Sequence, residues 1–357
     1  MSDRIYNFED FKDALATQVL ENLPKAFQMA DVSFHEVNKS GVGKVTGMTI
    51  RLPDSSIAPC IYIDSAYEEY KKYNLSLGQI ACSVAHSYLD VLEHARSITN
   101  DRNIRALAHE GFDWSTAKEL CMIKAVPVTG NDEFLAMRPY RTQGDMAAVY
   151  IINMGSNEQG QMSVAVTNDL AKQFGVSEKE LYAIASENMM KISPPVITGM
   201  DNMMNILFGF DMDDGIDTGK SFSESLAELP SPEAEITLNV LTNNDAVNGA
   251  AYVFIPAVMD QIAEKYPDGF YILPSSVHEV LIVPKNDDRV DLESLNAMVQ
   301  EINSIEVRPE DRLSDFVHEY DPAAKSIYIS GTEAPSKKQE MDMSAQEQKK
   351  TPKALAR

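Results

Sequence analysis

The segment from Gly269 to Pro284 constrains the fold of this chain most strongly. Two runs of apolar, strand-forming residues, GFYIL and VLIVP, flank a short polar centre from Pro274 to Glu279. Apolar runs of this length, bounded by turn residues, are typical of buried strands. Proline and serine at the start of the polar centre favour a turn. The sequence therefore predicts two strands joined by a turn that carries hydroxyl, imidazole and carboxylate groups.

The remaining sequence alternates between helical and strand patterns. Helical spacing and capping residues predict helices at 8–23, 65–73, 76–97, 103–120, 177–191, 256–266 and 292–302. Strand patterns occur at 32–37, 45–52, 58–63, 121–128, 134–137, 147–153, 162–167, 236–241, 250–255 and 326–329. The order strand, turn, strand, helix occurs twice, at 149–175 and 236–266. We therefore expect an α/β protein of the α+β type, with mixed, largely antiparallel sheets, ββα units and packed helices.

Changes in composition suggest how the chain is divided into domains. We predict an N-terminal α+β domain at 1–120 and a mixed α/β domain at 121–330, since 357 residues suit two domains. Clustered Met, Asp, Ser and Pro predict an irregular insertion at 194–232. From residue 331 the chain is polar, charged and repetitive, so a disordered tail is expected at 331–357.

The first residues and the cysteines favour a cytoplasmic protein. No basic segment followed by an apolar run is present at the start, so no secretory signal is expected. No window reaches about 18 uninterrupted apolar residues, so we expect no contact with a membrane. The three cysteines form no CxxC motif and lie in apolar surroundings, which predicts reduced core residues.

The formal net charge of −23 limits the partners that the chain can bind. A body this acidic is repelled by phosphate backbones, which argues against direct binding of nucleic acid. Two interpretations of the charge stay open. It can simply keep the protein soluble, or the carboxylates can mimic DNA and occupy a basic partner.

Three possible ligand motifs have unfavourable spacing. Residues 215–221 are one residue short of a phosphate-binding loop. Residues 211–222 depart from a calcium loop at the glycine and at the twelfth position. His86, Asp90 and His94 follow one helical stripe, but polar residues at that period also describe an exposed helix face. We therefore predict no metal site and no cofactor.

The polar centre of the opening segment provides the candidate site residues. A serine and an imidazole can support acyl transfer, with His278 as the base. Alternation along a strand would place Ser276 and His278 on one face and Glu279 on the other, so a local triad is not expected. A hydrolase using His278 with distant partners, a ligand or partner site at the strand ends, and a purely structural turn all stay open. The candidate residues are Ser275, Ser276, His278, Glu279, Asn243 and Asp245.

A second polar cluster surrounds His318. Asp315 precedes this histidine, and Glu319 and Tyr320 follow it. We expect a histidine with a structural role here.

The segments after residue 236 resemble a family of uncharacterised proteins. They are Leu241–Asp245, Ala251–Phe254, Tyr271–Leu281, Leu313–Asp315 and Val317–Tyr320. The family is a domain of unknown function in gut clostridia, similar to the YtpQ-like proteins of low-GC Gram-positive bacteria. The resemblance implies a bacterial protein of the cytosol, associated with mobile elements, and transfers no catalytic residue.

These observations favour a non-catalytic binding or regulatory role through an unknown protein partner. The alternatives are a hydrolase that uses His278 and an acidic DNA mimic that inhibits a nucleic-acid enzyme.

Overall fold

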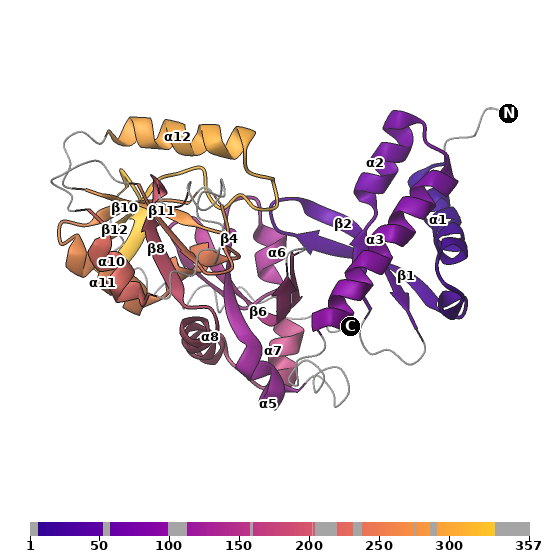
Figure 1. The fold of residues 1–357 in the computed structure, drawn as a ribbon, viewed down its shortest axis with the longest axis horizontal. Helices are drawn as coiled ribbons and strands as arrows, with labels where there is room; N and C mark the ends of the chain where they lie inside the picture. The colour runs from indigo at the N-terminus through magenta and orange to yellow at the C-terminus, as the bar shows by residue number, and fades with distance from the viewer. Residues whose placement is uncertain are drawn as a thin grey trace, which may run out of the picture. The chain divides into compact units, whose positions relative to one another are not determined.

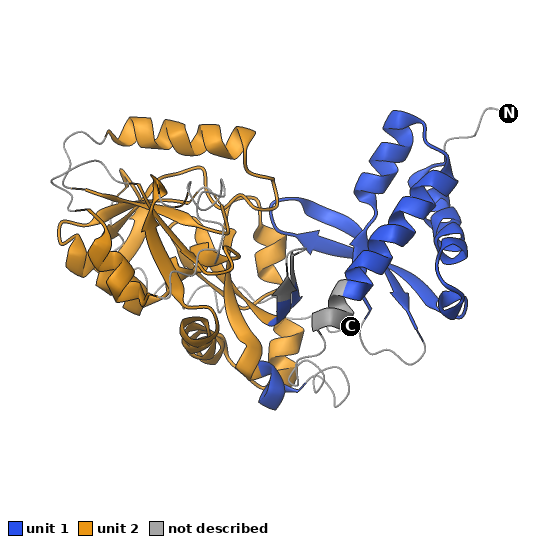
Figure 2. Cartoon of the chain, viewed as in Figure 1, with its two compact units in different colours: residues 1–117, 153–164 blue, residues 118–152, 165–357 orange. Residues whose placement is uncertain are grey.

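The chain forms two compact units. The computed structural model describes residues 6–52, 58–98, 113–157, 160–201, 203, 220–230, 238–274, 276–285 and 291–332. Unit 1 comprises residues 1–117 and 153–164, and unit 2 comprises residues 118–152 and 165–357 (Figure 2). The predicted domains, 1–120 and 121–330, stay a prediction. The predicted tail lies outside the described residues from residue 333 onward.

Unit 1 combines helices with a three-stranded antiparallel sheet of order β1-β2-β3 (Figure 1). Its elements are α1 (Phe8–Asn22), η1 (Lys25–Phe27), β1 (Asp31–Lys39), β2 (Gly43–Arg51), β3 (Cys60–Tyr62), α2 (Asp64–Tyr73), α3 (Leu77–Ile98) and α5 (Trp114–Ala117). Asn7 caps α1, because its side chain accepts a hydrogen bond from the backbone N–H of Asp10 at 2.9 Å. β1 and β2 form the predicted hairpin, in which Lys39 pairs with Gly43.

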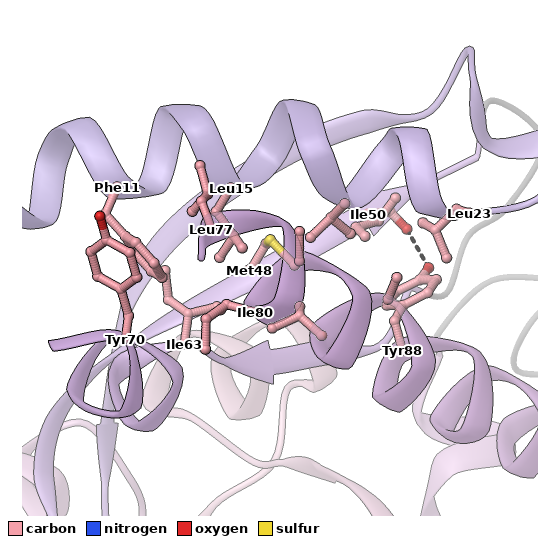
Figure 3. Close-up of a cluster of buried hydrophobic side chains, with 14 of the residues drawn as sticks. Phe11, Leu15, Leu23, Met48, Ile50, Ile63, Tyr70, Leu77, Ile80 and Tyr88 are labelled. Atoms are coloured by element: carbon pink, nitrogen blue, oxygen red, sulfur yellow. Dashed lines mark hydrogen bonds between the residues drawn. The ribbon is translucent and has the colours of Figure 1, made fainter. Parts of the chain in front are cut away.

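Alternation along β2 builds the core of unit 1 (Figure 3). Met48 and Ile50 lie in one buried cluster with Phe11 and Leu15 of α1. Tyr88 of α3 is also buried in this cluster, and its hydroxyl donates to the backbone carbonyl of Ile50 at 2.6 Å. The sheet and the helices therefore share one apolar core, fixed at one end by a buried hydrogen bond.

Unit 2 contains two sheets. Its elements up to residue 228 are η2 (Lys118–Leu120), β4 (Cys121–Pro127), α6 (Asp132–Ala136), β5 (Tyr140–Gln143), β6 (Met146–Asn157), β7 (Gly160–Ala165), α7 (Asn168–Phe174), α8 (Glu178–Ile192), β8 (Pro195–Gly199) and α10 (Phe222–Glu228). The later elements are β9 (Asn239–Asn243), η3 (Gly249–Phe254), α11 (Pro256–Lys265), β10 (Phe270–Leu273), β11 (Val280–Pro284), α12 (Leu292–Ile305), β12 (His318–Asp321) and β13 (Ser326–Ile329). β6 begins in unit 2 and ends in unit 1, and β7 begins in unit 1 and ends at Ala165 in unit 2.

The two sheets differ in size and order. One has six strands in the order β13-β12-β10-β11-β9-β8, and the other has the order β4-β6-β5, with β7 paired to β6. The helix α12 lies along one face of the six-stranded sheet (Figure 1), where Leu295 and Val299 pack with Leu281 and Val283 of β11. The pairings of these strands with assigned registers are antiparallel. The predicted fold class, mixed α/β with largely antiparallel sheets, is confirmed.

Two predicted strands are helical instead. The strand expected at 134–137 is replaced by α6, and β5 follows it. Asp132 and Glu133 occupy the first turn of α6, where carboxylates are favourable. The strand expected at 250–255 is the 3-10 helix η3, so the second ββα unit lacks its second strand. All six residues of η3 are buried, and Asn248 before it has a left-handed backbone that interrupts an extended chain.

The prediction of irregular structure at 194–232 is wrong near both ends of this range, where the chain forms β8 and α10. β8 pairs with β9 and forms an edge of the six-stranded sheet, so Pro195 begins an edge strand, where proline is tolerated. Ser221 and Glu224 form a capping box that starts α10.

No helix in the described part of the chain is long and apolar enough to cross a membrane.

Candidate functional site

The six-stranded sheet brings the two predicted halves of the site together. β9 ends at Asn243, and the antiparallel strand β11 begins at Val280, which pairs with Leu241. The chain after β9 therefore lies beside the chain before β11. The hydroxyl of Thr242 donates to the backbone carbonyl of His278 at 2.9 Å and joins the two segments.

Both ring nitrogens of His278 face groups of the chain. The backbone N–H of Asn248 donates to Nδ1 with 3.4 Å between the two nitrogens, so the neutral ring carries its proton on Nε2. Nε2 lies 3.5 Å from Oδ1 of Asp311. The side chain is 34% exposed, so one edge of the ring reaches solvent. This geometry fixes the ring between a loop and a carboxylate.

Ser276 is part of the same turn. Its hydroxyl oxygen accepts from the backbone N–H of His278 at 2.9 Å, and its residue forms a β-bridge with Arg312. The neighbouring Val277 donates its backbone N–H to the carbonyl of Asp311 at 2.8 Å. The serine is buried and is used to shape the backbone, rather than placed beside a ring nitrogen.

The segment from Asn243 to Asn248, called here the 243–248 loop, is held from within by Asn243. The buried amide of Asn243 donates to the carbonyl of Val247 at 2.8 Å and accepts from its N–H at 3.1 Å. Ala246 and Asn248 both have positive φ, near 51° and 56°. Gly249 follows, and a Cβ there would lie 2.5 Å from the carbonyl oxygen of His278. The loop is therefore fixed against the turn at His278.

The other predicted residues lie at the edge of this cluster. Asp245 is exposed on the 243–248 loop, and Glu279 is half-buried. Ser275 lies outside the described residues. The assumed strand alternation over 276–279 is wrong, because β11 begins only at Val280. Positions 276–279 form a turn, whose side-chain directions the hydrogen bonds decide.

Among the described residues, the cluster contains a histidine–aspartate pair but no hydroxyl at the second ring nitrogen. A general base needs a free lone pair within reach of the proton that it removes. The only lone pair of the neutral His278 ring accepts from Asn248. The described atoms therefore hold the 243–248 loop and the turn at 276–279 together.

Sequence reasoning missed a second histidine–aspartate pair. His318 is fully buried, as expected for a structural histidine. Its Nε2 lies 2.8 Å from Oδ1 of Asp145 and accepts the backbone N–H of Asp145 at 3.4 Å, while its Nδ1 lies 3.0 Å from the carbonyl oxygen of Phe316. The hydroxyl of Ser314 donates to the other carboxylate oxygen at 2.8 Å. Gly144 leaves room for the ring, since a Cβ there would lie 2.4 Å from a ring carbon of His318. The sequence indicated only the turn at Gly144-Asp145. It could not indicate the pair, because 169 residues separate Asp145 from Ser314.

In the part of them that the structure describes, the weaker motifs supply no ligand site. Residues 211–219 lie outside the described residues, and Ser221 and Lys220 are used locally, by the α10 cap and by an ion pair of 2.6 Å with Glu228. The side chain of His94 is also outside the described part. Within that part, no group of three or more His, Cys, Asp or Glu side chains is arranged to hold a metal.

The fold and this cluster define a mixed α/β protein in which polar side chains join the end of β9 to the start of β11. A family model described as "Family of unknown function (DUF5688)" matches residues 8–322. The chain belongs to this family. No curated protein and no solved structure gave a match. The relation to gut clostridia and to YtpQ-like proteins stays an expectation.

Proposed function

We propose that this protein is a non-catalytic binding or regulatory protein of the bacterial cytosol, and that it acts through contacts with another protein. The observation that carries the proposal is the hydrogen bond from Asn248 to Nδ1 of His278. Because of this bond, His278, the candidate base of the predicted site, supports the 243–248 loop.

The supported loop is suited to recognition. Asp245 and Ala246 are exposed, while Asn243 and Asn248 at its ends are buried. Exposed loops held by a rigid scaffold are where binding residues concentrate, since a preorganised loop loses little entropy on association. We therefore place the partner surface on the 243–248 loop and the neighbouring turn at 276–279.

A pull-down with matched variants tests the proposal. The tagged wild-type protein is incubated with host lysate, retained proteins are quantified by mass spectrometry, and the leading partner is purified for titration. We expect Asp245→Lys to weaken the affinity by about tenfold or more, as for a central interface residue. Asp268→Lys, at an exposed residue outside the loop, is the control and should leave the affinity unchanged.

The hydrolase alternative is tested with the same proteins. Wild type and His278→Asn are assayed against ester, amide and phosphoester substrates. A turnover that wild type shows and the folded variant lacks would overturn the non-catalytic proposal.

The formal charge of −23 favours one second candidate, a DNA mimic that occupies a basic protein. This candidate predicts that the captured partner binds DNA and that duplex DNA competes with the protein for it. A partner bound equally well with and without DNA would contradict it. A role in a mobile element, which the family resemblance implied, would fit either kind of partner.

A further inference from the structure

A cysteine and a histidine meet on the sheet of unit 1. The sequence placed all three cysteines in the core, but Cys60 and Cys82 are exposed, and only Cys121 is buried. Sγ of Cys60, on β3, lies 3.6 Å from Nε2 of His35, on β1. Both side chains reach across the central strand β2, where His35 pairs with Gly47.

Gly47 makes this approach possible. A Cβ at this position would lie 2.5 Å from Sγ of Cys60 and 3.1 Å from Nε2 of His35. Any other residue would fill the space that the thiol and the ring share. Because Gly47 has no side chain, the central strand β2 leaves room above it for Sγ of Cys60 and Nε2 of His35.

The separation of the two atoms fits a tetrahedral metal. Zinc binds thiolate sulfur at about 2.3 Å and imidazole nitrogen at about 2.0–2.1 Å, so a tetrahedral angle places the two ligand atoms about 3.5–3.6 Å apart. The observed 3.6 Å agrees with this value. Without a metal, the same distance is a hydrogen bond between a thiol and an imidazole.

A neighbouring hydroxyl fits the role of a supporting group. Thr49 pairs with Cys60 across β2 and β3, is buried, and forms a hydrogen bond with its sulfur. Hydrogen bonds from outer groups orient metal ligands and tune their affinity.

We propose that Cys60 and His35 form a surface half-site for a thiophilic divalent cation of the zinc class. Two protein ligands leave two positions of a tetrahedral ion open, for water in the lone chain or for a donor group of a partner. This inference departs from the sequence-based expectation of no metal and is independent of the proposed function.

The experiment uses the full chain, kept reduced and free of chelator. Zinc binding is measured by calorimetry, and cobalt is added as a spectroscopic substitute, because a thiolate ligand gives cobalt a charge-transfer band in the near ultraviolet. We expect that band in the wild type and in Cys82→Ser, a control that removes the other exposed thiol. It should be absent in Cys60→Ser.

Three further variants locate the site. His35→Gln and Gly47→Ala should each lower the zinc affinity by at least about tenfold, the first by removing a ligand and the second by filling its space. Thr49→Val should lower it by about tenfold, with both ligands kept. Thermal unfolding shows whether each variant is folded. A wild type that gives no band, or a band that survives in folded Cys60→Ser, would overturn the proposal.

Discussion

The backbone N–H of Asn248 donates a hydrogen bond to Nδ1 of His278, from a loop that begins 35 residues earlier in the chain. Because Thr242 also holds the carbonyl of His278, the histidine is tied to this loop region through both its ring and its backbone. The bond explains why a histidine stands between two strands without the geometry of a catalytic base.

The first prediction measures how much the hydrogen bond accepted by Nδ1 of His278 contributes to stability. In His278→Asn, the amide oxygen can occupy the position of Nδ1 and accept from Asn248, so we expect a free energy of unfolding close to that of the wild type. His278→Ala removes this acceptor and the ring, and should cost about 1–3 kcal/mol. Urea denaturation measures both. Equal losses in the two variants would show that the Asn248 bond contributes nothing.

A second prediction concerns the close approach at Gly249. A Cβ there would meet the carbonyl oxygen of His278 and Oγ1 of Thr242, each at 2.5 Å, so Gly249→Ala should destabilise unit 2 by about 1–3 kcal/mol. Gly199→Ala is the matched control, since nothing lies within 4 Å of its Cβ position. Its unfolding midpoint in urea should stay near that of the wild type. A tolerated Gly249→Ala would contradict the packing described here.

The core of unit 1 depends on the hydroxyl of Tyr88. Tyr88→Phe removes its donor to the carbonyl of Ile50 and should lower the free energy of unfolding by about 1 kcal/mol. Tyr73→Phe, at a side chain that is 60% exposed, should change it little. Urea unfolding followed by circular dichroism gives both values, and equal effects would show that this bond adds no stability.

The buried pair of Asp145 and His318 should be strongly coupled. A double-mutant cycle with Asp145→Asn and His318→Gln is expected to give a coupling of about 0.5–3 kcal/mol, because the ring is fully buried and 2.8 Å from the carboxylate. The exposed pair of Glu187 and Lys191 serves as the control, with an expected coupling of about 0.3–0.5 kcal/mol. A larger coupling at the exposed pair would reject this account of unit 2.

Alkaline pH should destabilise the protein. Burial raises the pKa of the Cys121 thiol from 9.0 to about 12, and burial also raises the pKa of Tyr266 from 10.0 to about 12. In this window the folded state holds protons that the unfolded state has lost. The free energy of unfolding therefore falls as the pH rises from about 9 towards 12. Urea midpoints measured across this range check the sign, and a rising midpoint would contradict it.

The same burial predicts how the thiols react. An aromatic disulfide reagent at pH 8 should titrate Cys60 and Cys82 in the folded protein, and Cys121 only after denaturation. Three fast thiols in the folded state would contradict the burial of Cys121.

Local signals in the sequence were sufficient for much of the fold. Asn7, Ser177 and Pro256 marked the starts of α1, α8 and α11, because caps and first-turn prolines act within a few residues. The hairpin of β1 and β2 and the pair of β10 and β11 were likewise predictable from apolar runs and turn residues.

The errors arose where distant contacts decide the structure. Residues 250–255 look like a strand, but Gly249 packs against His278, and the following residues are buried as η3. Pro195 looks like a breaker until its place at the edge of the six-stranded sheet is known. The candidate cluster around His278 was found from composition, whereas its partners Asn248 and Asp311 depend on the sheet topology.

The most direct test of the central claim is the affinity of the purified partner for the His278→Asn protein. The account predicts an affinity within about threefold of the wild type, which corresponds to less than about 0.7 kcal/mol, because the variant keeps the acceptor that supports the 243–248 loop. Asp245→Lys should weaken binding in the same titration. A folded His278→Asn protein whose affinity for the partner falls by tenfold or more, or which has lost a hydrolytic turnover shown by the wild type, would contradict the account.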